Sequence, residues 1–325
     1  MPATAFRRGV RLAFSAAVCL VPDTRRRLGW FYPMSKANSL KVVFDTNALA
    51  NDSFEVLAGS RMLELVERGR IVPVYGHVFM EETIAAYGSE KHREHLLTKR
   101  LPFIARTAKL LCLDFDAIWH AELVQGLGKK APIYLHPRQH RWVQKSLLRV
   151  PNDGSWKVWH DAEAARVLDA ARRDGQVSVW KQIRAEVAAW KERLSYDPKI
   201  HGGLDKREFL QRIFPHIGRA LIFGMVRTKN PQAVFDRWAR AWNDYPYFTH
   251  FVRDMAYLGY YAAHAEQAID KNAQADMNLL SLLLNADMVV SNEKRFLRTA
   301  FQEVWAPRRK TLFTAEEFVR YMEKL

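Results

Sequence analysis

The segment KVVFDTNALAND, residues 41–52, decides the fold of this chain. It begins with an apolar run rich in β-branched side chains, which favours a buried strand. Asp45, Thr46 and Asn47 follow the run directly, and helical spacing begins soon afterwards. A strand that ends in a carboxylate and leads into a helix is typical of a parallel α/β sheet. In such sheets, ligands bind outside the carboxyl ends of the strands.

The same alternation of strand and helix occurs on both sides of a long central region. The Gly69 that closes the first helix and the capping box of Thr314 with Glu317 mark helix boundaries. We therefore expect an α/β fold with a parallel sheet flanked by helices. The expected helices cover residues 53–68, 77–88, 275–286, 292–304 and 314–325, and the further strands cover residues 70–76 and 287–291.

The central region, residues 89–272, is predicted to be a large, mostly α-helical insertion that splits the α/β core into residues 40–88 and 273–325. Apolar residues recur there at helical spacing and strand patterns are few. Its expected helices cover residues 161–175, 178–194, 231–245 and 249–270, and its expected loops cover residues 126–140 and 194–209.

The first 39 residues are predicted to lie outside the fold. Arg7, Arg8 and Arg11 precede a short apolar stretch, which resembles a secretory signal, but a triple arginine follows where a cleavage site would stand. Met34 opens a segment that reads as a natural start. We interpret residues 1–39 as a basic arm or a mis-assigned start.

The overall charge narrows the class of partner. Among 325 residues the formal net charge is +15, which favours polyanions: nucleic acid or an acidic membrane surface. A basic protein without such a partner is the simpler alternative. No run of eighteen apolar residues predicts a membrane span. Cys19 and Cys112 form neither a metal motif nor a disulfide framework, so a cytoplasmic location is expected.

Acidic and polar residues follow the predicted strands at several places. These residues are Asp45, Thr46 and Asn47 after the first strand, Glu81 and Glu82 after the second, Asp276 in the helix before the last clear strand, and Ser291, Asn292 and Glu293 after that strand. Taken singly, each acid could be a helix cap or a solvated surface charge. Together they could converge on one sheet edge, where clustered carboxylates need a cation. We expect Mg²⁺ or Mn²⁺ there, which would activate water and bind a phosphate oxygen.

Four segments carry a family resemblance: VVFDTNAL, VFMEET, ADMNLLSLLLNADMVVSNEKRFL and LFTAEEFVRYM. They resemble the PIN domain, a fold of metal-dependent ribonucleases that includes toxins of toxin–antitoxin pairs. The resemblance covers residues 40–88 and 273–325. It implies that Asp45, Glu81, Asp276 and Glu293 bind metal and carry catalysis, with Glu82 competing with Glu81. It also implies that Thr46, Asn47, Ser291 and Asn292 orient the substrate or the ligands.

One position departs from the family pattern. Glu293 stands where the family commonly has Asp, and its extra methylene would hold a metal more loosely or through water. This difference puts the number of bound metals in question. A phosphatase of the haloacid-dehalogenase type is disfavoured, because it needs a second acid two residues after Asp45 and this chain has Asn47 there.

The resulting prediction is a Mg²⁺- or Mn²⁺-dependent endoribonuclease, with RNA as its substrate and an antitoxin protein as a possible partner. A homo-oligomer is also possible, and no membrane partner is expected. The alternative is a PIN-like nucleic-acid-binding module without turnover, which Glu293 keeps open. A nuclease that acts on DNA is a third reading.

Two features of the predicted insertion bear on RNA binding. Residues 135–149 interleave basic and aromatic side chains, which suits a nucleic-acid backbone with stacked bases, although a solvated helix face explains them equally well. Tryptophans at helical spacing, such as Trp238 and Trp242, are typical of a core. The insertion holds eight tryptophans: Trp119, Trp142, Trp156, Trp159, Trp180, Trp190, Trp238 and Trp242.

Overall fold

The computed structural model describes residues 39–86, 90–153, 206–264 and 272–325, with residues 181, 185, 188, 189 and 192 in addition. The chain forms two compact units. Unit 1 contains the described residues of 39–113, 133–153 and 282–325, and unit 2 contains Asp114–Pro132 and the described residues of 170–281. The predicted N-terminal arm and the expected helices 161–175 and 178–194 lie almost wholly outside the described residues.

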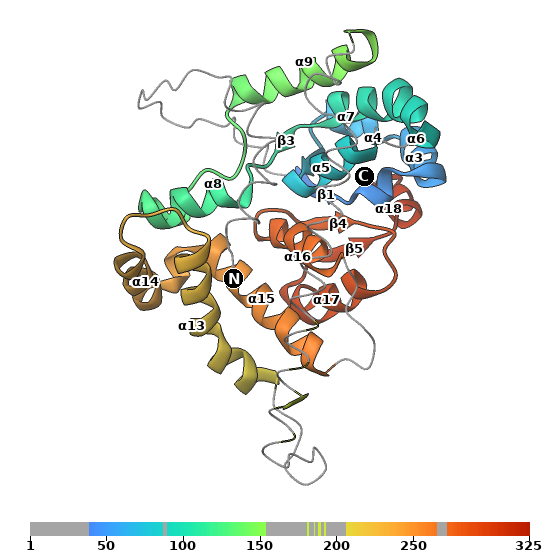
Figure 1. The fold of residues 1–325 in the computed structure, drawn as a ribbon. Helices are drawn as coiled ribbons and strands as arrows, with labels where there is room; N and C mark the ends of the chain where they lie inside the picture. Colours follow the sequence, from blue (N-terminus) through green and yellow to red (C-terminus); the bar gives the residue numbers. More distant parts are fainter. Residues whose placement is uncertain are drawn as a thin grey trace. The chain divides into compact units, whose positions relative to one another are not determined.

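Unit 1 is built on a five-stranded sheet in which every described pairing is parallel, as the sequence predicts (Figure 1). The strand order is β3-β2-β1-β4-β5. Val43 pairs with Val74 on one side and Val289 on the other. The strands are β1 (Leu40–Phe44), β2 (Ile71–Tyr75), β3 (Leu110–Leu111), β4 (Met288–Val290) and β5 (Thr311–Phe313).

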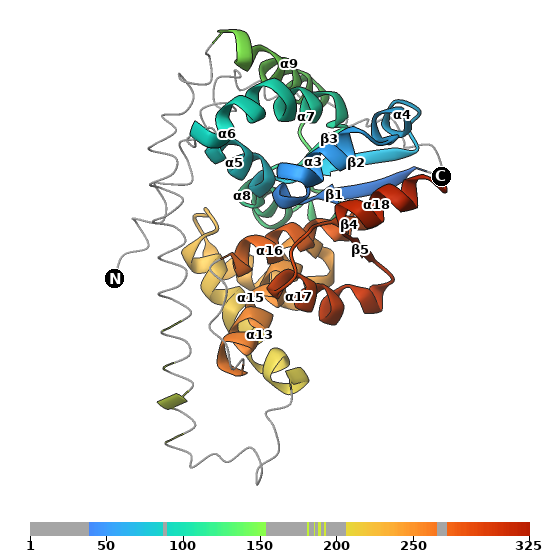
Figure 2. The ribbon, with the colours of Figure 1, turned by 90° about the vertical axis from the view of Figure 1, so that its right-hand side faces the viewer.

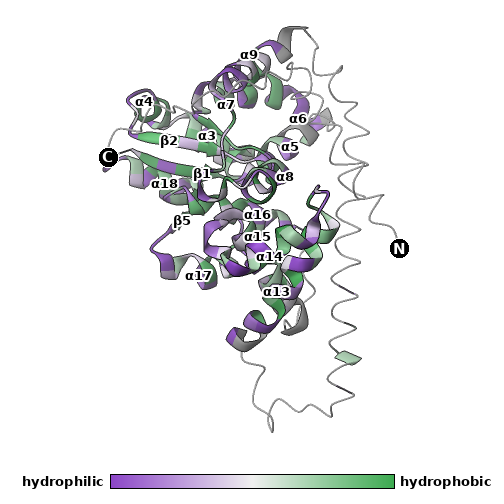
Figure 3. Ribbon diagram, turned by 90° about the vertical axis from the view of Figure 1, so that its left-hand side faces the viewer, coloured by the Kyte–Doolittle hydropathy of each residue, from purple (hydrophilic) through white to green (hydrophobic). Residues whose placement is uncertain are grey.

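The inner strands are buried on both faces. Val43 and Val74 are no more than 1% exposed, and Phe44, whose side chain points to the opposite face, is 0% exposed. Phe44 packs edge-on against Phe318, at a ring-centroid distance of 5.7 Å. Burial on both faces explains why β1 and β2 read as apolar runs rather than as alternating patterns, and Figure 3 shows these two strands mostly in green.

Helices surround this sheet in unit 1 (Figures 1 and 2). The predicted capping box at Thr314 and Glu317 is confirmed as the start of the last helix. The helix predicted over residues 53–68 is two helices, because Ser60 Oγ accepts a hydrogen bond from the Met62 amide and closes a turn between them. The helices of unit 1 are α3 (Asn51–Ala58), α4 (Met62–Glu67), α5 (His77–Ala85), α6 (Glu90–His95), α7 (Leu101–Thr107), α9 (Pro137–Asp153), α17 (Phe296–Val304) and α18 (Ala315–Met322).

Shorter helical segments join these elements. Four are 3₁₀ turns or single π-helical turns that continue an α-helix. In unit 1 they are η1 (Thr46–Leu49), η3 (Leu96–Arg100), η7 (Leu282–Leu284) and η8 (Ala306–Arg308).

The predicted insertion is divided between the two units, so its boundaries differ from the expected ones. The two-residue strand β3 pairs with Val74 and Tyr75, and α7 contributes buried Leu101 and Ile104 to the core beside the sheet. Pro73 is tolerated in β2 because β3 pairs only with the two residues beyond it. Residues 90–113 and 133–153 therefore belong with the α/β core. The predicted core segment 273–281 falls instead in unit 2.

Unit 2 is helical throughout its described residues. Its core contains Trp119 and Trp238, with 3% and 0% exposed, whereas Trp242 is 41% exposed. The expectation of a core position is thus confirmed for Trp238 and wrong for Trp242. The elements of unit 2 are α8 (Phe115–Trp119), η4 (His120–Val124), η5 (Gly128–Lys130), α13 (Lys206–Gly224), α14 (Pro231–Arg240), η6 (Trp242–Asp244), α15 (Pro246–His264) and α16 (Ala273–Ser281).

A buried carboxylate holds the start of α15. Glu122 is 0% exposed and accepts hydrogen bonds from the backbone amides of Tyr247 (2.9 Å) and Phe248 (2.8 Å). These amides lie in the first helical turn, which has no intrahelical acceptors of its own. Burial raises the pKa of Glu122 to about 7, although the two amides oppose the shift.

A second buried polar contact links α15 to α16. Ser281 Oγ donates a hydrogen bond of 2.6 Å to Asp254 Oδ2, and His250 Nε2 lies 3.5 Å from Asp254 Oδ1. All three side chains are at most 2% exposed. This contact fixes the helix that carries Asp276 within unit 2. No helix in the described part of the chain combines the length and apolarity needed to cross a membrane.

Candidate functional site

The candidate site lies in unit 1, where the direction of strand order reverses between β1 and β4. Such reversals leave a crevice beside the carboxyl ends of the strands, because the connections leave in opposite directions. Asp45 follows β1 and Ser291 follows β4. Their backbones are held by the sheet: the Asp45 amide donates to Val290 O at 3.0 Å, and the Ser291 amide donates to Phe313 O at 2.9 Å.

Asp45 is the central carboxylate of this site. It is 9% exposed, and its Oδ2 accepts a hydrogen bond of 2.6 Å from Ser291 Oγ. Burial raises the pKa of the Asp45 carboxyl above its ordinary value, and hydrogen bonds from Ser291 and Thr46 oppose that shift. The carboxylate is therefore placed where a positive charge would be stabilising.

Thr46 connects Asp45 to a second acid. Its hydroxyl donates to Glu82 Oε2 and lies 3.3 Å from Asp45 Oδ1. Glu82 comes from α5, which follows β2, so the carboxylates arrive from adjacent strands. The structure thus brings Asp45, Thr46, Glu82 and Ser291 together.

Arg100 is a member of this site that sequence reasoning missed. It ends η3, is 8% exposed, and its Nη2 donates to Thr46 O at 3.1 Å. Burial lowers its pKa to about 10, opposed by the charges of Glu82, Tyr75 and Asp45. The guanidinium therefore offsets part of the negative charge of the two carboxylates.

One signal in the sequence could have found this arginine. Arg100 lies four residues after Leu96, which is 1% exposed, so the two share the buried helix face. Its neighbour Lys99 points outward, with its side chain 53% exposed, and pairs with Glu55. The chemical types of these two adjacent cations do not distinguish them.

The two asparagines predicted to orient the site join its loops. Asn47 Oδ1 accepts from the Asn292 amide at 2.8 Å. Asn292 Oδ1 in turn accepts from the Ala315 amide at 2.9 Å, and its Nδ2 donates to Ser53 Oγ. These bonds join the ends of β1 and β4 to the starts of α3 and α18, so Asn47 and Asn292 support the site rather than add charge to it.

The other predicted acids have different surroundings. Glu81 Oε1 lies 3.0 Å from His77 Nε2 on the same helix, and Glu293 Oε1 accepts from the Arg295 amide at 2.8 Å. The amide of Glu293 itself donates to Ser291 Oγ at 3.1 Å, which keeps that residue beside the site. Asp276 lies in the first turn of α16, in unit 2. That Asp276 joins Asp45 stays a prediction.

The donor set at Asp45 is compatible with a divalent cation. Asp45 and Glu82 supply carboxylate oxygens, and the Ser291 and Thr46 hydroxyls lie beside them. Mg²⁺ is commonly held by one or two carboxylates while it keeps several waters and binds a substrate phosphate. Among the described residues no group of three or more His, Cys, Asp or Glu side chains forms a metal-binding cluster.

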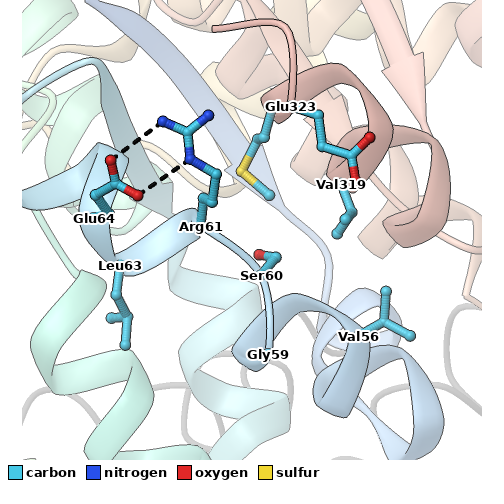
Figure 4. Close-up of a pocket in the computed structure, with 9 residues that line it drawn as sticks. Val56, Gly59, Ser60, Arg61, Leu63, Glu64, Val319 and Glu323 are labelled. Carbon is cyan, nitrogen blue, oxygen red and sulfur yellow. Dashed lines mark hydrogen bonds and ion pairs between the residues drawn. The ribbon is translucent and has the colours of Figure 1, made fainter.

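A surface pocket of unit 1 has another location and another chemistry. It has a volume of about 570 Å³ and lies between α3, α4 and α18 (Figure 4). Val56, Leu63 and Val319 line it, and the Arg61–Glu64 ion pair of 3.1 Å lies at its border. None of the residues brought together around Asp45 lines this pocket.

Comparison of this chain with protein-family models, with curated proteins and with solved structures found no match.

Proposed function

We propose that the chain is a metal-dependent endoribonuclease with a PIN-like core. The observation that carries the proposal is the joining of Asp45, Thr46, Glu82 and Ser291 at the reversal point of a parallel sheet. Residues of three motifs that resemble the PIN domain thus meet in space, although they are far apart in sequence. The net charge of +15 supports a polyanionic substrate.

The proposed roles follow from the contacts of each side chain. Asp45 and Glu82 would hold Mg²⁺ or Mn²⁺, which, when bound, activates water and stabilises charge on a phosphate oxygen. Ser291 would hold Asp45 in position through its hydrogen bond, and Thr46 would keep the two carboxylates in register. Hydrolysis would leave a 5′-phosphate and a 3′-hydroxyl, as the family resemblance implies.

Glu82 is proposed as the ligand in place of Glu81, because only Glu82 has a described contact with Thr46. Asp276 and Glu293 remain further proposed ligands. Glu293 would take part once its carboxylate leaves the Arg295 amide. The number of metals in the proposed site therefore depends on these two acids.

The test is cleavage of a structured RNA by the purified protein with Mg²⁺, with Mn²⁺ and with EDTA. We expect cleavage with metal, none with EDTA, and none by Asp45→Asn. The matched control is Asp287→Asn. Asp287 Oδ2 accepts from the Lys41 amide at 2.8 Å, at the opposite ends of the same two strands. This control should cleave like the wild type.

Two further arms refine the proposal. Glu82→Gln should abolish cleavage and Glu81→Gln should leave most of it, whereas the reverse result would move the metal site to Glu81. Ser291→Ala should lower the rate by about 10- to 100-fold, as is typical for a group that orients a metal ligand. Replacing RNA with DNA identifies a DNA nuclease.

The second candidate is a nucleic-acid-binding module without turnover. The buried cation Arg100 favours it, because a guanidinium beside Asp45 and Glu82 offsets carboxylate charge without a metal. Tight binding of RNA with no product under any metal condition would establish this candidate instead.

A further inference from the structure

Helix α9 carries a row of exposed cations. Arg138, Arg141, Lys145 and Arg149 are all exposed. They are spaced three or four residues apart, so their side chains share one face of the helix. At 1.5 Å per residue, the row extends over about 16 Å.

The opposite face of α9 is fixed to unit 1. Gln144 Nε2 donates to the carbonyl oxygens of Ala105 at 3.1 Å and Ala108 at 2.9 Å, at the end of α7. Leu147 is 2% exposed and belongs to the core that also contains the sheet residues. The helix is thus held in one rotation about its axis, with the cations directed to solvent. Figure 3 shows both purple and green segments along α9, as expected for an amphipathic helix.

The charge of this row is not compensated within the described residues. Other surface cations have carboxylate partners, such as Arg68 with Glu64 at 2.9 Å and Lys99 with Glu55 at 2.6 Å. None of the four cations of α9 forms an ion pair with another described residue. The sequence from Ile133 to Asn152 contains neither Asp nor Glu. Like charges at this spacing repel one another, and an external anion would relieve that repulsion.

Large apolar side chains stand within the same row. Trp142 is 36% exposed and lies four residues after Arg138 and three before Lys145. Leu148 is 47% exposed, beside Arg149. An indole between cations is the combination that binds single-stranded nucleic acid, since phosphates take the charges and an unpaired base stacks on the ring. A duplex keeps its bases stacked inside and offers none to the indole.

We propose that the α9 basic face, formed by Arg138, Arg141, Trp142, Lys145 and Arg149, binds single-stranded RNA. The cations hold successive phosphates and Trp142 stacks on a base. This inference deepens the proposed function, on which it rests for the choice of RNA, by naming the surface that holds the substrate and its single-stranded form.

The experiment measures binding without cleavage. The full chain with Asp45→Asn is titrated with a fluorescent, unstructured 20-nucleotide RNA in EDTA, at several salt concentrations. A variant with all four α9 cations changed to Gln is compared with a variant in which four ion-paired cations, Arg61, Arg68, Arg106 and Lys129, are changed to Gln. Both variants lose the same net charge, so a difference between them reports the location of the charges.

We expect the α9 variant to lower the slope of log K against log salt by about 2.8, or about 0.7 for each phosphate contact on a single strand. The paired-cation variant should keep the wild-type slope. Trp142→Ala should weaken binding about 5- to 100-fold at an unchanged slope, because stacking involves no counterion release. Circular dichroism establishes that each variant is folded.

Equal effects of the two charge variants would overturn the inference, as would unaltered binding by Trp142→Ala. A parallel arm uses vesicles that contain phosphatidylserine. If α9-dependent binding occurs to these vesicles and not to RNA, the surface binds membranes and the inference is wrong. If α9-dependent RNA binding is found in a wild-type chain that never cleaves RNA, only the proposed nuclease function fails.

Discussion

Arg100→Met tests the electrostatics of the candidate site. Methionine keeps much of the length of the side chain and removes its charge and the hydrogen bond to Thr46 O. Asp45 and Glu82 then lose the buried cation beside them. Removing one partner from a buried charge pair typically costs about 3–5 kcal/mol, because the remaining charge stays desolvated. Since Arg100 is 8% exposed, solvent screens this loss only slightly.

The assay is urea unfolding in EDTA, with hydrogen exchange of the β1 amides as the readout for unit 1. The matched control is Arg106→Met on the adjoining helix. The Arg106 side chain is 58% exposed and lies 3.7 Å from Glu67, so its loss should cost less than about 1 kcal/mol. A loss below about 1 kcal/mol for Arg100→Met would refute the idea that Arg100 balances the two carboxylates.

The same variant connects stability to the proposed metal. A cation bound at Asp45 and Glu82 would replace the missing positive charge. Mg²⁺ at 100 times its dissociation constant would stabilise the folded state by about 2.7 kcal/mol. We therefore expect Mg²⁺ to restore much of the stability lost by Arg100→Met. No stabilisation by Mg²⁺ or Mn²⁺ in the variant or in the wild type would contradict metal binding at these two acids.

Two further predictions concern unit 2. The pKa of Glu122 is about 7 when folded and ordinarily 4.5, so between these values the folded state keeps a proton that the unfolded state has released. The free energy of unfolding should therefore fall by about 3 kcal/mol as pH rises from 4.5 to 7, and Glu122→Gln should remove this slope in urea titrations at several pH values. Parallel pH profiles for both proteins would rule out the role of Glu122. Gly218→Ala should destabilise unit 2 by about 1–3 kcal/mol, because a Cβ there would overlap ring carbons Cη2 and Cζ3 of the buried Trp238. Gly259→Ala, with no atom within 4 Å of its new Cβ, should instead stabilise unit 2 by up to about 1 kcal/mol. The opposite order of thermal stabilities would show that α13 and α14 do not approach closely at Gly218.

The sequence by itself determined the parallel sheet and the place of its central carboxylate. The apolar run before Asp45 can only be a strand that is buried on both faces, and Thr314 with Glu317 satisfies the free amides of a helix start locally. These features depend on neighbouring residues, so local physical chemistry is sufficient to predict them. Ser291 was likewise predictable as the residue after a strand, and the structure places its hydroxyl on Asp45.

Only the tertiary structure decided which polar side chains join that carboxylate. Glu81 and Glu82 are adjacent on α5 and point in directions about 100° apart, so the rotation of the packed helix selects Glu82. Arg100 and Lys99 differ in burial for the same reason. The strand β3, with two residues, is formed only because Tyr75 and Val74 offer it an unpaired edge. Each of these outcomes depends on contacts between segments distant in sequence, which no local pattern of residues encodes.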